Sequence, residues 1–100
     1  MIVVEGSARI PSGAWDKALK AMEKMIIASR AETGCIEYAY SRDALDPDLL
    51  RIIERWDDLA ALKAHFAEPH MADFRQALAE IGPQGLEVRM YEADPQPLPT

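Results

Sequence analysis

The distribution of apolar residues along the chain predicts a succession of short strands and amphipathic helices. Residues 2–10 alternate loosely between apolar and polar and are rich in β-branched side chains, which is typical of a strand. Apolar residues then recur at helical spacing from Trp15 to Ser29, and charged residues occupy much of the opposite face. A turn-forming segment at residues 11–13 separates these two elements, and Ser12 is expected to cap the helix.

The second half of the chain repeats this alternation. Residues 35–42 and 49–56 are predicted strands, and the D-P-D turn signal between them favours an antiparallel hairpin. A helical stripe follows over about residues 59–66. Pro69 interrupts it and is suited to the first turn of another helix, which a Gly-Pro pair ends. Residues 86–92 are the last predicted strand.

The element order β-α-β-β-α-β is the ferredoxin-like plan. It predicts an α+β fold with a four-stranded antiparallel sheet and helices on one face. We expect one domain over residues 1–92, and an exposed arm over the proline-rich residues 93–100. The apolar residues of the strands, Val88 and the tyrosines among them, are expected to supply both faces of the sheet. A second copy of the chain would cover the open face, so we expect a homodimer.

Composition narrows the possible partners. The net charge of −6 disfavours binding to nucleic acid or to an anionic membrane, and no apolar run is long enough to span a bilayer. The start, M-I-V-V-E-G, lacks the pattern of a secretory signal. The single cysteine, Cys35, cannot form an internal disulfide, so the cytoplasm is the simplest location.

Both histidines of the chain, His65 and His70, fall within the short run from Glu54 to Phe74. Histidine is the side chain that most readily changes charge near neutral pH, so either could deprotonate a phenol. The alternative is that His65 packs in the core and that His70 is a surface or capping residue. On a continuous helix five residues would turn the two side chains about 140° apart. This spacing and the lack of a supporting ligand predict no metal site.

Glu54 and Trp56 share one face of a predicted strand. Glu54 could polarise a histidine or a substrate hydroxyl; otherwise it pairs with a cation such as Arg51 or Arg89, or lines a cavity, because an unpaired buried acid is costly. Trp56 could form an aromatic wall for a planar substrate, although a core position with a partner for the indole N–H is favoured. Tyr38 could bind a ligand or pack at the dimer face.

The chain resembles the antibiotic biosynthesis monooxygenase family through three motifs and the order in which they occur. They are E-T-G-C-I-E-Y at Glu32–Tyr38, E-R-W at Glu54–Trp56, and the H-x4-H pair His65 and His70 followed by Phe74. The resemblance implies a dimeric α+β barrel, similar to quinol monooxygenases, that oxidises a phenolic, quinol or anthrone-type molecule with O2 and uses neither metal nor cofactor. Together with the chemistry of the side chains described above, this makes His65, His70 and Glu54 our candidate catalytic residues.

Our candidate substrate-binding residues are Trp56, Tyr38 and Phe74. Haem-degrading proteins share the fold but resemble the chain less, because Phe74 stands where they place the haem-binding histidine. A non-catalytic small-ligand or stress-response protein with the same barrel is the main alternative, and a purely structural dimerisation module is another. The expected function is therefore a cofactor-independent monooxygenase with a small aromatic substrate.

Overall fold

A computed structural model describes residues 1–100, and it contains the predicted strands and helices in the predicted order. A single 3-10 turn, η1, precedes the first helix, and the helical segment after β3 is divided in two. The elements are β1 Ile2–Arg9, η1 Ser12–Ala14, α1 Trp15–Arg30, β2 Cys35–Arg42, β3 Leu49–Trp56, α2 Leu59–Phe66, α3 Pro69–Ile81 and β4 Gln84–Glu92.

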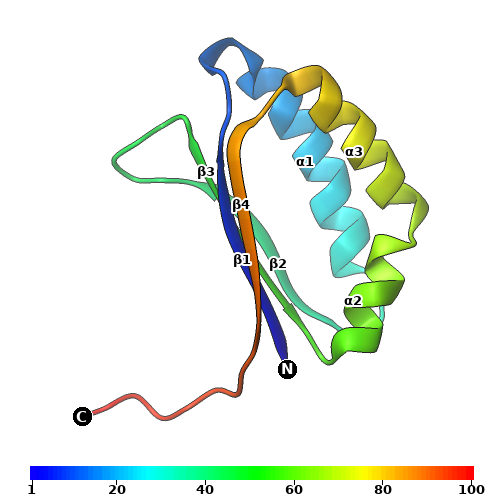
Figure 1. Cartoon of the computed structure of the whole chain (residues 1–100), viewed down its shortest axis with the longest axis vertical. Coiled ribbons are helices and arrows are strands. Elements are labelled where there is room, and N and C mark those ends of the chain that lie inside the picture. The colour runs from blue at the N-terminus through cyan, green and yellow to red at the C-terminus, as the bar shows by residue number, and fades with distance from the viewer.

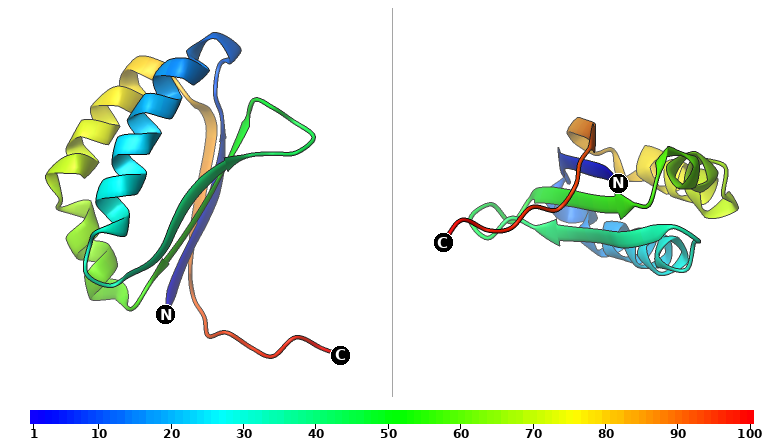
Figure 2. Two further views of the ribbon diagram at one scale, coloured as in Figure 1. Left: turned by 180° about the vertical axis from the view of Figure 1, so that it is seen from behind. Right: turned by 90° about the horizontal axis from the view of Figure 1, so that it is seen from below.

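The strands form one antiparallel sheet in the order β2-β3-β1-β4. The helices lie together on one side of this sheet, and the other side is left open (Figures 1 and 2). Beyond β4, Ala93 still exchanges backbone hydrogen bonds with Met1, and the following residues continue to Thr100 as an extended arm that leaves the sheet (Figure 1). The fold is therefore the predicted ferredoxin-like α+β arrangement.

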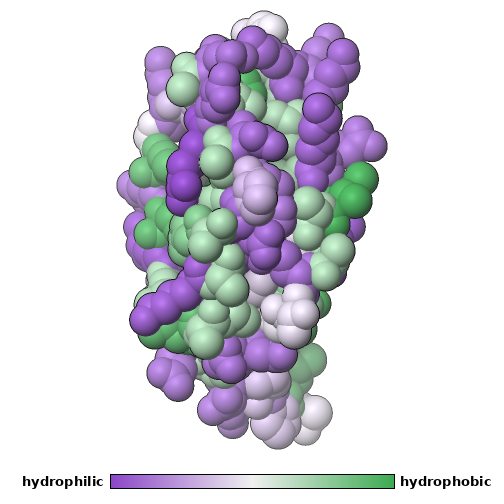
Figure 3. All heavy atoms as spheres, turned by 90° about the vertical axis from the view of Figure 1, so that its right-hand side faces the viewer, coloured by the Kyte–Doolittle hydropathy of each residue, from purple (hydrophilic) through white to green (hydrophobic).

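The main core lies between the sheet and α1. Alternate residues of the central strands point toward the helices, as the two-residue period of a strand requires, and α1 contributes an apolar stripe against them. The buried apolar residues of this layer include Ile2, Val4, Leu50, Ala18, Met22 and Met25. Hydrophilic and hydrophobic residues are interspersed on the outer surface of the helical layer (Figure 3).

Helix boundaries follow local sequence signals, with one exception. Pro69 occupies the first turn of α3, and Gly82 ends that helix in the left-handed conformation with φ 72°. Asp58 caps α2 by accepting a hydrogen bond from the backbone N–H of Ala61. The prediction that Ser12 caps α1 is wrong, because Ser12 lies inside η1 and α1 begins three residues later without a side-chain cap.

Strand register shows which apolar residues of the strands supply each face of the sheet. Tyr38 and Tyr40 stand opposite Glu54 and Ile52, and Val88 stands opposite Gly6, so all of them belong to the face under the helices. Tyr38 and Tyr40 therefore do not contribute to the open face, whereas Tyr91, which stands opposite Val3, does.

The open face is more polar than the sequence suggested. Its apolar residues include Val3 and Ile53, and it carries the ion pairs Arg55–Glu37 and Arg89–Glu5.

Candidate active site

A buried carboxylate joins the two histidines. Oε2 of Glu32 lies 2.6 Å from Nδ1 of His65 and 2.7 Å from Nε2 of His70. An ionised carboxylate can only accept hydrogen bonds, so each of these nitrogens donates its proton to the same oxygen. The side chains of Glu32 and His65 are 8% and 2% exposed, whereas that of His70 is 22% exposed. We call these three residues the Glu–His–His cluster.

The backbone around Gly34 allows the cluster to form. Gly34 has φ 86°, and a Cβ atom there would stand 2.7 Å from the Cβ of Ala61 in α2. Its carbonyl accepts a hydrogen bond from the backbone N–H of Asp57 at 2.9 Å. Glycine thus lets the loop after α1 pack closely against the first turns of α2. The loop carries Glu32, and α2 carries His65 near its end.

The break between α2 and α3 brings His70 to the same carboxylate. α2 ends at Phe66 and α3 begins at Pro69, so the two histidines belong to different helices. The angle expected for a continuous helix therefore does not apply. The predicted interruption at Pro69 is confirmed, and with it both histidine side chains reach the same carboxylate.

Aromatic rings surround His65. Its ring centroid lies 4.7 Å from that of Trp56 and 5.5 Å from that of Tyr38. Trp56 is fully buried and Tyr38 is 1% exposed. His65 is therefore held inside the core, where packing fixes the ring while Glu32 fixes its proton.

Glu54 lies on the same sheet face but is bonded elsewhere. Its Oε1 accepts the indole N–H of Trp56 at 3.0 Å, and no cation pairs with it. Burial raises the pKa of this carboxyl above its usual value, although the Trp56 hydrogen bond and the charge of a protonated His65 oppose the rise. The expectation that Glu54 pairs with Arg51 or Arg89 is wrong. The prediction that Trp56 lies in the core and that its indole N–H has a hydrogen-bond partner is confirmed.

The hydroxyls of Tyr38 and Tyr40 share a hydrogen bond of 2.7 Å, and Tyr40 packs its ring against Phe74. Burial is the largest cause of the raised pKa of both phenols. Both tyrosines therefore remain protonated over the physiological range and can act as neutral hydrogen-bond donors.

A cleft between α1 and α3 exposes one end of the cluster. It has a volume of about 300 Å³, and His70 and Phe74 are part of its lining, together with Met25. His65 does not line this cleft. Of the six residues predicted for the site, only His70 and Phe74 therefore contact this solvent-accessible cavity.

A larger hollow of about 580 Å³ lies between α1 and β2, away from both histidines. Most of its lining is apolar, including Met22, Ile26 and Leu50. Tyr40, which shares a hydrogen bond with Tyr38, also lines it. Arg42 closes part of it by stacking on the Trp15 ring at 4.0 Å.

The Glu–His–His cluster also has the composition of a metal site. The ligand atoms of Glu32, His65 and His70 all lie within 4.8 Å of one another, and two imidazoles with one carboxylate suit a divalent metal. A metal ion would have to displace both protons that the imidazoles now donate to Glu32. In the structure each imidazole instead donates one N–H to the carboxylate.

Glu32 is the residue that sequence reasoning missed. It appeared only as the first letter of the E-T-G-C-I-E-Y motif, and no spacing rule links it to histidines 33 and 38 positions later. An acid two residues before a glycine at the start of a strand was the available signal. That pattern has no fixed chemical meaning without the tertiary contact.

Comparison with known proteins agrees with the fold and identifies the family. The family model for antibiotic biosynthesis monooxygenase matches residues 1–77. A Deinococcus radiodurans protein assigned to the same family superposes with a TM-score of 0.91 at 26% identity, covering 100% of this chain and 99% of that one. Another antibiotic biosynthesis monooxygenase superposes with a TM-score of 0.80 at 30% identity, covering 95% of this chain and 100% of that chain.

A curated relative, the uncharacterized protein sll1783 of Synechocystis sp., is 28% identical over 91 residues. The match covers 91% of this chain and 62% of the length of that relative. The superpositions place the chain among small α+β proteins with a ferredoxin-like sheet. Within this class, the chain belongs to the antibiotic biosynthesis monooxygenase family. No helix has the length and apolar character needed to cross a membrane.

Proposed function

We propose that this protein is a monooxygenase that oxidises a phenolic, quinol or anthrone-type molecule with O2 and needs no metal or organic cofactor. Family membership supports the reaction class. The observation that carries the proposal is His70: one ring nitrogen donates to buried Glu32, and the side chain lines a cleft beside Phe74.

In this proposal His70 is the general base. Glu32 holds the proton on Nε2, which leaves Nδ1 of a neutral His70 free to accept a proton from the substrate. A carboxylate that orients an imidazole and stabilises its charged form is the arrangement used in acid–base dyads. His65 donates the second hydrogen bond to Glu32 and so positions the carboxylate. Glu54 forms a hydrogen bond with Trp56 and with neither histidine, so we assign it to the support of Trp56.

The chemistry needs no further reductant. Removal of a proton turns a phenol or anthrone into an anion that donates electrons to O2 far more readily. One oxygen atom enters the substrate and the other leaves as water, with the substrate as source of both electrons. For an anthrone, the CH2 group becomes a carbonyl, and one molecule of O2 yields one of anthraquinone and one of water.

We also propose that the protein is a homodimer through the open sheet face. Half-buried Val3 and Ile53 provide apolar contacts there. Charges of both signs on the same face allow ion pairs between copies. Sedimentation equilibrium tests this proposal, and a monomer at micromolar concentration would contradict it.

Isotopic labelling tests the proposed reaction. The protein is incubated with anthrone or a naphthoquinol under ¹⁸O2, and the product is analysed by mass spectrometry. We expect incorporation of one labelled oxygen atom at a rate above the reaction without protein. Product that contains no label, or label at the same rate without protein, would refute the monooxygenase assignment.

The hollow of about 580 Å³ favours a second candidate, a ligand-binding protein without catalysis. Its apolar lining would hold a flat hydrophobic molecule remote from both histidines. This alternative predicts that such a ligand raises the melting temperature and is recovered unchanged. Oxidation of the ligand would exclude it.

A further inference from the structure

We propose that the cleft between α1 and α3 recognises a negatively charged oxyanion group on an aromatic substrate, with Lys20 and Lys24 as the binding cations. This inference rests on the proposed function for its choice of substrate, since it adds a charged group to the same aromatic molecule. It concerns recognition, however, and is tested by binding alone.

The distribution of lysine is the first observation. The chain has only four lysines, and Lys17, Lys20 and Lys24 all line this one cleft. Their spacing along α1 places them on one side of the helix, toward α3. Because the protein carries a net charge of −6, such a concentration of positive charge is unusual for its surface.

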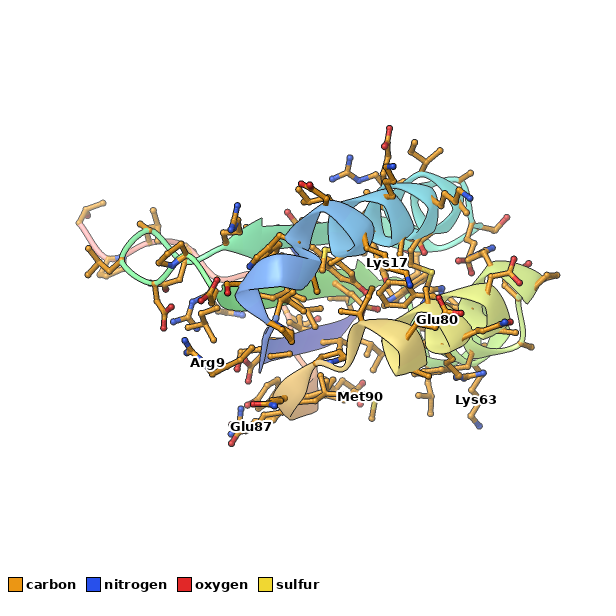
Figure 4. All side chains as sticks on the ribbon, turned by 90° about the horizontal axis from the view of Figure 1, so that it is seen from above. Arg9, Lys17, Lys63, Glu80, Glu87 and Met90 are labelled. Carbon is orange, nitrogen blue, oxygen red and sulfur yellow. The ribbon has the colours of Figure 1, made fainter.

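Ion pairing distinguishes the three. Lys17 binds Glu80 across the cleft at 3.1 Å, and Figure 4 shows these two side chains reaching toward each other between α1 and α3. Lys20 and Lys24 take part in none of the ion pairs in the structure. Asp73 is the one acid in the cleft lining, so an excess of positive charge remains available to a ligand.

The rest of the lining suits the aromatic part of the ligand. Met25, Phe74 and Ala77 supply an apolar surface, and His70 lies among them. A molecule whose anionic group met the two lysines could therefore place its ring against Phe74 and its hydroxyl near His70. The same lysines would favour the anionic form of a phenol, because a nearby opposite charge stabilises ionisation.

A matched pair of stable ligands tests the proposal by isothermal titration calorimetry. One is 1-hydroxy-2-naphthoate and the other is 1-naphthol, which differ only in the carboxylate. We expect the carboxylate ligand to bind about three- to tenfold more tightly, in line with the modest strength of solvent-exposed ion pairs. The preference should weaken as ionic strength rises, because salt screens exposed charges.

Substitution of the lysines makes the test specific. The Lys20→Gln, Lys24→Gln double variant should bind both ligands with equal affinity. Lys63→Gln is the matched control, because Lys63 is a lysine of α2 that does not line the cleft and points away from it (Figure 4). Lys20, Lys24 and Lys63 are all exposed, so folding of both variants should be unaffected.

Three results would overturn the inference: equal affinity for the two ligands, a preference that survives in the double variant, or the same loss in the Lys63 control. Inorganic phosphate should bind more weakly than the naphthoate, because it lacks the ring; equal affinity would remove the aromatic part of the proposal. Binding without any turnover would leave this inference standing while the proposed function failed. Oxidation of neutral and acidic quinols with equal KM would support the proposed function and contradict this inference.

Discussion

Nδ1 of His65 donates a hydrogen bond of 2.6 Å to Oε2 of Glu32, although 33 positions separate the two residues in the chain. The pair joins the loop after α1 to α2 inside the core. The same carboxylate oxygen accepts the N–H of His70, which lines the cleft. A substrate proton taken up by His70 would therefore be stabilised by a charge that His65 holds in place.

Removing the charge of Glu32 should impair catalysis more than folding. Glu32→Gln keeps an acceptor oxygen but cannot stabilise an imidazolium, so we expect kcat/KM to fall at least about tenfold, given the usual size of general-base effects. The pH profile of kcat/KM should change as well, which a purely structural role would not cause. Glu68→Gln is the control, because Glu68 precedes α3 and its side chain caps nothing. An unchanged pH profile in Glu32→Gln would contradict the role of the carboxylate.

The buried carboxyl of Glu54 predicts a pH-dependent stability. Burial raises its folded-state pKa, so the folded protein retains this proton at pH values where the unfolded chain has lost it. Stability from this group is therefore complete below the unfolded value and is lost as pH rises through the folded value. Glutamine does not ionise, so Glu54→Gln should gain melting temperature relative to the native protein as pH increases from 4 to 8.

Circular dichroism melts at the two pH values measure this difference, and the same exchange at exposed Glu92 provides the control. We expect little change with pH for the Glu92 variant. A difference at Glu54 that shrinks toward pH 8 would show that the carboxylate stabilises the fold when charged.

Gly34 should be intolerant of a side chain. Gly34→Ala places a Cβ at positive φ and against Ala61, so we expect a loss of about 1–3 kcal/mol in the free energy of unfolding. Gly13→Ala is the matched control: no atom lies within 4 Å of the added Cβ, and its effect should stay within about 0.5 kcal/mol. Urea denaturation compares the two variants. Equal stabilities would show that the loop does not need this conformation.

Chelation should leave the activity intact. Because Glu32 already accepts both imidazole N–H groups, we expect oxygen uptake to be the same before and after dialysis against EDTA. Addition of Fe(II), Mn(II) or Zn(II) should not increase it. Loss of activity on chelation, with recovery on adding one of these ions, would identify the Glu–His–His cluster as a metal site instead.

Much of the fold could be predicted because its signals are local. The alternation in β1, the amphipathic stripe of α1 and the proline at the start of α3 each depend on neighbouring residues. The cap of α1 was mispredicted for the same reason: Ser12 is a good local candidate, but the chain makes a 3-10 turn there.

The candidate site was only partly predictable because it depends on long-range contacts. The histidines were conspicuous in the sequence, whereas Glu32 became relevant only when Gly34 and the helix break brought three segments together. Of the alternatives for Glu54, pairing with a cation is excluded, because its partner is the neutral indole of Trp56 two residues along the same strand. Pattern alone could not distinguish these partners.

Oxygen uptake by the native protein and by the His65→Ala, His70→Ala double variant is the most direct test of the proposed function. Both proteins are given anthrones and naphthoquinols in air-saturated buffer, and circular dichroism verifies that the variant is folded. We predict uptake by the native protein well above that of the variant with at least one substrate. Equal uptake across the whole panel would contradict catalysis by these histidines.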